Sequence, residues 1–167
     1  MEEIRNKVAE SGIVSLDLAE FLHGKEREVI DIAPLLWQGL AIKEKDFRNW
    51  MAETDWTKYA GKYVSVYCSA EAILPTWVWL LLSSSLSAHA KKVFFGTEDD
   101  LIESIILQSI TEIGDEHYLN ARVVVKGCSE YSLSPAVYIA LTAKLVPQVK
   151  SLMFGEPCST VPVFKKK

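Results

Sequence analysis

Three cysteine–serine pairs are the residues of this chain best suited to chemistry. The pairs are Cys68-Ser69, Cys128-Ser129 and Cys158-Ser159, and they contain every cysteine among the 167 residues. Each pair lies just past an apolar run that is typical of a buried strand. If these strands are parallel, their carboxyl ends share one edge of a sheet, which is where open α/β folds bind ligands. The pattern therefore predicts that the three thiols gather at this edge.

Gathered thiols would suit a metal ion. Thiolate sulfurs bind zinc at about 2.3 Å, and three cysteinates also suit an iron–sulfur cluster. The hydroxyls of Ser69, Ser129 and Ser159 could donate hydrogen bonds to the sulfurs. One nearby carboxylate, of Glu71, Glu130 or Glu156, could complete the ligand set. The choice between zinc, iron and a cluster stays open. The predicted metal ligands are Cys68, Cys128 and Cys158.

Two other interpretations of the cysteines stay open. One reactive thiolate would make the protein a small thiol-dependent enzyme, and Cys158 is then the strongest candidate because it lies in a loop beside Pro157. Alternatively, the cysteines are small buried apolar residues, and the protein is a non-catalytic interaction module. The sequence contains no C-x-x-C pair, no glycine-rich phosphate loop and no G-x-S-x-G motif. It therefore does not identify a reaction.

The elements that must position the cysteines alternate regularly after residue 61. Apolar runs predict strands about thirty residues apart, a spacing that parallel βαβ units require. Right-handed crossovers then give a mostly parallel sheet with helices on its faces. The predicted strands cover 62–67, 92–96, 122–126 and 151–155, followed by an edge strand at 161–164. The predicted helices cover 73–88, a segment capped by Thr97, and a segment that starts at Ser134-Pro135 and runs to Val146.

The first sixty residues have a different pattern. Alternation of apolar and polar residues predicts a half-buried strand at 13–18 and a second strand at 27–32, antiparallel to the first. A helix over 45–53 follows. We therefore expect a single α/β domain with a mostly parallel central sheet, in which residues 1–60 are an N-terminal β-containing extension and 61–164 are the regular βα units.

Composition narrows the classes of partner. Apolar residues make up 49% and charged residues 24% of the chain, which is ordinary for a folded domain. The net charge of −4 disfavours non-specific binding to nucleic acid or to anionic membranes. Met1-Glu2-Glu3 does not resemble a secretory leader, and the apolar stretch at 73–82 is too short to span a bilayer. We expect a cytoplasmic protein with free thiols. A second copy of the chain is a candidate partner, since Trp37, Trp50 and Trp56 are expected to be either core residues or dimer contacts.

Four segments resemble a known family. They are Leu40–Arg48, Tyr67–Trp77, Val125–Cys128 and Phe154–Pro162, and they include the three cysteines. Together they make nearly the whole chain similar to a bacterial family of uncharacterised proteins, a domain of unknown function. The resemblance implies no particular activity. It does imply an association with iron–sulfur assembly, and therefore iron–sulfur assembly proteins as partners.

Overall fold

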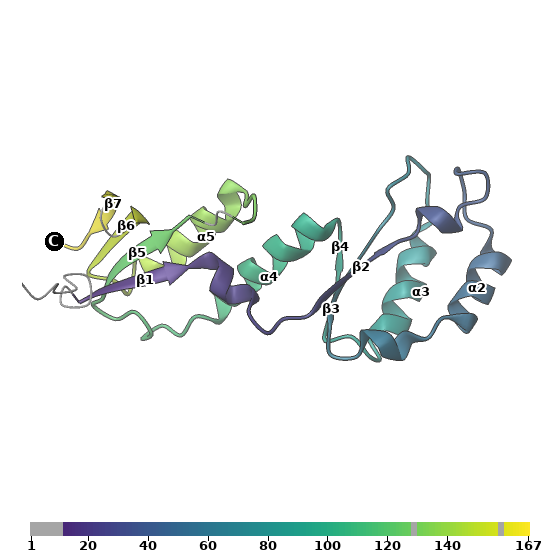
Figure 1. Ribbon diagram of the computed structural model, residues 1–167, viewed down its shortest axis with the longest axis horizontal. Coiled ribbons are helices and arrows are strands. Elements are labelled where there is room, and N and C mark those ends of the chain that lie inside the picture. The colour runs from purple at the N-terminus through teal and green to yellow at the C-terminus, as the bar shows by residue number, and fades with distance from the viewer. Residues whose placement is uncertain (1–11, 128–129, 157–158) are drawn as a thin grey trace, which may run out of the picture. The chain divides into compact units, whose positions relative to one another are not determined.

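The chain is organised into two compact units (Figure 1). The computed structural model describes residues 12–127, 130–156 and 159–167. One unit combines the segment that ends at His23 with Glu103–Lys167, and the other unit is Gly24–Ile102. Each unit contains its own sheet of strands, accompanied by helices. The prediction of an α/β fold with mostly parallel strands is confirmed, whereas the division of one domain at residue 60 stays a prediction.

Sheet A, in the first unit, has four strands in the order β1-β5-β6-β7. The strands β1, β5 and β6 are parallel, and β7 returns antiparallel to β6. Val123, Val124 and Val125 are all buried, as expected for a central parallel strand that is covered on both faces. The bounds are β1 Ile13–Asp17, β5 Arg122–Lys126, β6 Ser151–Glu156 and β7 Ser159–Lys165.

Sheet B, in the second unit, has three parallel strands in the order β2-β3-β4. The bounds are β2 Arg27–Asp31, β3 Tyr63–Tyr67 and β4 Lys92–Phe95. The expected antiparallel pairing of β1 with β2 is wrong, because β1 pairs in parallel with β5 and β2 pairs in parallel with β3. Alternation in a sequence reports which face of a strand is buried, but it does not report the neighbouring strand. The seven strands of the described chain form two separate sheets, and not the single sheet that was expected.

Four α-helices and three short 3₁₀ segments connect the strands of the described chain. The helices are α2 Glu44–Glu53, α3 Thr76–Leu86, α4 Glu98–Glu112 and α5 Pro135–Leu145. The 3₁₀ segments are η1 Leu18–Leu22, η2 Ala33–Leu35 and η3 Trp56–Tyr59. The predicted helix at 73–88 begins three residues later, because a residue that precedes proline disfavours the helical conformation. Within the described residues, no helix combines the length and apolar character needed to cross a bilayer.

The core of the second unit is rich in aromatic rings. Phe47 of α2 is 2% exposed and contacts Trp50 and Trp77, with ring centroids 5.6 and 5.8 Å apart. Trp56 stacks edge-on against Trp50 at 5.7 Å. Four tryptophans therefore contribute to packing, because Trp79 also packs against this core. By contrast, Trp37 is 48% exposed.

Candidate functional site

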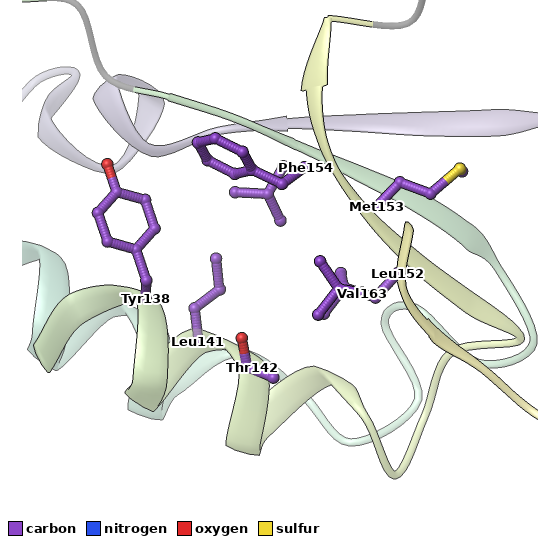
Figure 2. Close-up of a pocket in the computed structure, with 8 residues that line it drawn as sticks. Tyr138, Leu141, Thr142, Leu152, Met153, Phe154 and Val163 are labelled. Atoms are coloured by element: carbon purple, nitrogen blue, oxygen red, sulfur yellow. The ribbon is translucent and has the colours of Figure 1, made fainter. Parts of the chain in front are cut away.

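An apolar pocket lies between α5 and the β6–β7 side of sheet A (Figure 2). Its volume is about 310 Å³, at the lower end of the range for small-molecule sites. The lining combines residues of one helix with residues of three strands. They are Val125, Tyr138, Leu141, Thr142, Leu152, Met153, Phe154 and Val163.

Residues on one face of β5 and β6 form one wall of the pocket. Val125 lies opposite Phe154 in the parallel register of β5 and β6, and Leu152 lies two residues earlier on the same face of β6. Figure 2 shows the Leu152 and Phe154 side chains on the pocket side, whereas the Met153 thioether points away from it. Val163 adds a rim from β7. The wall is therefore almost entirely hydrocarbon.

Residues on one face of α5 form the other wall of the pocket. Tyr138, Leu141 and Thr142 have the i, i+3, i+4 spacing that places side chains on one helical face. Figure 2 shows all three rising from α5 toward the strands. The Tyr138 ring stands edge-on to Phe154, with centroids 5.9 Å apart. The hydroxyls of Tyr138 and Thr142 are the polar side-chain groups that an otherwise apolar ligand would meet.

The start of α5 is fixed by Ser134. Its hydroxyl accepts a hydrogen bond from the backbone N of Ala136 at 3.2 Å, and Pro135 occupies the first turn. This confirms the predicted Ser134-Pro135 start, since serine caps a helix and proline suits its first position. Ser134 is also bound to the Glu103 carboxylate of α4. The cap therefore holds the end of α5 from which Tyr138 projects.

The carboxyl edge of sheet A carries an exposed ion pair. Lys126 ends β5 and Glu156 ends β6, and Nζ of Lys126 lies 3.8 Å from Oε2 of Glu156. The two side chains are 33% and 64% exposed, so this pair contributes little to stability. Glu156, one of the predicted ligand residues, thus faces a cation of the neighbouring strand.

Cys68 and Ser69 lie at the carboxyl end of β3 in sheet B. Cys68 is half-buried, and its thiol donates a hydrogen bond to the Ala70 carbonyl at 3.5 Å. The Ser69 hydroxyl donates to Oδ2 of Asp31 at 2.6 Å, and the Ser69 backbone N donates to Oδ1 at 3.0 Å. Burial raises the pKa of Asp31, but the hydrogen bonds from Ser69 and Ala33 outweigh this effect, so that its pKa lies below the ordinary value.

The three predicted metal ligands follow strands of two different sheets. Cys128 and Cys158 come shortly after β5 and β6, which are adjacent in sheet A, whereas Cys68 follows β3 of sheet B. Cys128, Ser129 and Cys158 lie outside the described residues, and Ser159 begins β7. The shared-edge argument therefore applies to Cys128 and Cys158 only. Over the ranges that the structure describes, no group of three or more His, Cys, Asp or Glu side chains could hold a metal, and the three-cysteine site stays a prediction.

Sequence reasoning missed the pocket and its lining. A usable signal was the i, i+3, i+4 spacing of Tyr138, Leu141 and Thr142, in which two hydroxyl-bearing residues flank a leucine on a face that is otherwise apolar. The contribution of Val163 had no local signal, because it depends on the return of β7 alongside β6.

Comparisons with curated proteins and with solved structures give no match. A family model described as a protein of unknown function, DUF2480, matches residues 2–166, which is nearly the whole chain. The chain therefore belongs to this family of proteins of unknown function.

Proposed function

We propose that this protein binds a small, mainly apolar ligand in the pocket between α5 and sheet A. The observation that carries the proposal is the lining itself, in which hydrocarbon side chains surround a volume of about 310 Å³ and two hydroxyls provide polar contacts. Small-molecule sites have this composition, because apolar contact supplies affinity and a few polar groups orient the ligand. The ligand class is an aromatic or branched aliphatic molecule with one or two hydrogen-bonding groups.

Exposure of the rim gives the ligand a route into the pocket. Phe154 is 40% exposed and Val163 is 52% exposed, although both line the pocket. Large apolar side chains that remain this accessible lose water contact when a ligand covers them, at about 25 cal/mol per Å² of apolar area. Ligand binding would therefore bury surface that the protein alone leaves in water.

A neutral fluorescent probe tests the proposal. N-phenyl-1-naphthylamine is apolar, carries no charge and becomes bright in a dry environment, so that titration into the full-length protein measures its Kd. Val163→Trp places a larger side chain at the rim and should weaken binding by about tenfold, which corresponds to 1.4 kcal/mol. Thr142→Phe, which fills the pocket from the α5 side, should have the same effect.

Ile139→Trp is the matched control. Ile139 lies on α5 next to Tyr138, but it is 69% exposed and does not line the pocket. This variant should bind the probe as the unchanged protein does, provided that circular dichroism shows the same fold. Equal weakening by Ile139→Trp, or undiminished binding by both filling variants, would show that the probe binds elsewhere and would refute the proposal.

A thiol site at the carboxyl edge of sheet A is the second candidate. It is supported by the parallel pairing of β5 with β6, because these neighbouring strands end at the same edge and Cys128 and Cys158 follow them in the sequence. Two cysteinates would supply half of a tetrahedral zinc site or part of an iron–sulfur ligand set. The alternative use of the same edge is a reactive Cys158 thiolate.

Metal analysis after anaerobic purification tests this second candidate. Cys128→Ser and Cys158→Ser should each remove bound zinc or iron, and Cys68→Ser reports whether Cys68 is a third ligand. If the unchanged protein stays free of metal after reconstitution with zinc and with iron and sulfide, the metal proposal fails. In that case, alkylation by iodoacetamide that is much faster at Cys158 than at the other two cysteines would support the reactive thiolate.

A further inference from the structure

The opposite face of sheet A carries a second hollow with different chemistry. Leu152 and Phe154 face the apolar pocket, so alternation directs their neighbours Ser151 and Met153 to the other face of β6. There, eight of the described residues line a groove of about 400 Å³. Three of them are the cations Arg122, Lys150 and Lys165, and none is acidic. In a chain with a net charge of −4, this is a local concentration of positive charge.

Strand register aligns three polar residues of the groove, Arg122, Ser151 and Lys165, in one row. Ile13, Arg122, Ser151 and Lys165 are consecutive partners across β1, β5, β6 and β7. Neighbouring strands lie about 4.8 Å apart, so the backbones at Arg122 and Lys165 are about 10 Å apart. The residue between them is Ser151, whose hydroxyl can donate to an oxygen held by the two cations. The row therefore places donors from three adjacent strands along one groove.

The three cations have no carboxylate partner within the described part of the chain. The ion pairs found there include those of Arg48, Lys62, Lys126 and Lys144, and none of them involves a cation of the groove. Arg122, Lys150 and Lys165 are all exposed, so their charges are available to a ligand. Arginine in such a position binds a carboxylate or phosphate through two parallel hydrogen bonds.

The remaining lining of the groove is apolar. It consists of Ile13, Met153, Pro162 and Phe164. Among them, Ile13, Met153 and Phe164 are only partly exposed, and together with the cations they line the groove, where they make an apolar floor. A bare inorganic anion would use the cations but leave this floor in water. A ligand that carries an anionic group on an apolar body would use both.

We propose that this groove binds a small organic oxyanion, in which a phosphate or carboxylate contacts Arg122, Ser151 and Lys165 and an apolar body covers Met153 and Phe164. The volume of about 400 Å³ suits a small molecule. The site is separate from the apolar pocket, because it lies on the other face of the sheet and, among the residues that the structure describes, Met153 alone lines both. Its failure would leave the pocket proposal untouched.

Titration of isotope-labelled full-length protein with phenyl phosphate tests this site. Backbone amide shifts in two-dimensional NMR spectra locate the probe and give its Kd, and the amides of Arg122, Ser151 and Lys165 should move together. Benzyl alcohol, which offers a similar ring without the charge, should not move them. Arg122→Gln/Lys165→Gln should weaken phenyl phosphate binding by about tenfold or more, since it removes charged hydrogen bonds.

A control variant that loses the same amount of positive charge elsewhere distinguishes binding of phenyl phosphate in the groove from general electrostatic attraction to the protein. Lys45→Gln/Lys91→Gln removes two exposed cations of the other unit and should leave the Kd for phenyl phosphate unchanged. An equal loss in this control would show that only net charge matters, and the proposal would be refuted. It would also be refuted if the groove amides did not shift, or if the Arg122/Lys165 variant bound phenyl phosphate as tightly as the unchanged protein.

Discussion

The Glu103 carboxylate of α4 accepts two hydrogen bonds from Ser134, the residue that caps α5. The Ser134 backbone N lies 3.0 Å from Oε2 of Glu103, and the Ser134 hydroxyl lies 2.5 Å from Oε1. Both side chains are half-buried, and hydrogen bonds to a charged acceptor are stronger than those between neutral groups. One serine thus anchors the start of α5 to α4 and caps its first turn.

Loss of this anchor should destabilise the protein. Ser134→Ala removes the cap and one of the two bonds to Glu103, so we expect the free energy of unfolding in urea to fall by about 1–3 kcal/mol. Ser132→Ala changes an exposed serine two residues earlier and should have almost no effect. Equal stability of the two variants would show that the Glu103–Ser134 contact contributes nothing to folding.

Gly96 should not tolerate a side chain. Its φ is +130°, and a Cβ at this position would lie 2.6 Å from both Cβ and Oδ2 of Asp100. The Asp100 side chain cannot move away from this Cβ freely, because its carboxylate accepts hydrogen bonds from the backbone N and the hydroxyl of Thr97, both at 2.8 Å. Gly96→Ala should therefore lower the free energy of unfolding by about 1–3 kcal/mol.

Gly114→Ala is the matched control for this glycine. No atom lies within 4 Å of the position that a Cβ would take at Gly114, so thermal and urea unfolding should change little. A Gly96→Ala variant as stable as Gly114→Ala would show that Asp100 and Thr97 can move to accept the Cβ without a loss of unfolding free energy.

Asp31 should make the free energy of unfolding depend on pH in the acidic range. Its pKa in the folded protein lies below the ordinary value of 3.8, because the hydrogen bonds from Ser69 and Ala33 outweigh desolvation. The folded state therefore binds the proton less readily than the unfolded state does. The resulting stability is fully present above about pH 4 to 5 and is lost as the pH falls through the folded pKa.

Asp31→Asn should accordingly matter more at neutral pH than in acid. We expect its free energy of unfolding to lie below that of the unchanged protein at pH 7, and the difference to shrink as the pH approaches 3. Glu71→Gln, at an exposed position near Ser69 in sequence, controls for the general loss of a negative charge. A difference for Asp31→Asn that stayed constant from pH 7 to pH 3 would contradict the assignment.

Local features of the fold were predictable, whereas the pairing of strands was not. Ser134-Pro135 predicts the start of α5, because helix capping and the fixed geometry of proline depend on only a few neighbouring residues. The run at 122–126 likewise coincides with β5. By contrast, the alternation at Ile13–Asp17 is the same whichever strand lies beside it, and the structure pairs β1 with β5 across a long stretch of chain.

The candidate sites depend on these non-local pairings. The pocket needs Val163 of β7 opposite α5, and the groove needs Arg122, Ser151 and Lys165 in one row. Both arrangements depend on sheet register, which long-range packing determines. The cysteine hypothesis assumed one sheet, and it was the separation of β3 from β5 and β6 that removed its argument for Cys68.

Leu141 should link the stability of the first unit to ligand binding. It is 1% exposed and lines the pocket between Tyr138 and Thr142 on α5. Leu141→Ala removes buried hydrocarbon and should cost about 2–5 kcal/mol of unfolding free energy. Ile139→Ala, on the same helix but 69% exposed, should cost well under 1 kcal/mol.

The enlarged pocket gives this variant a second readout. N-phenyl-1-naphthylamine should raise the melting temperature of Leu141→Ala, because a ligand that binds the folded state alone stabilises it by mass action and the vacated volume adjoins its site. Ile139→Ala should respond to the probe as the unchanged protein does. If the probe stabilised neither Leu141→Ala nor the unchanged protein, then the space beside Leu141 would be a packing defect of the core and not a binding site.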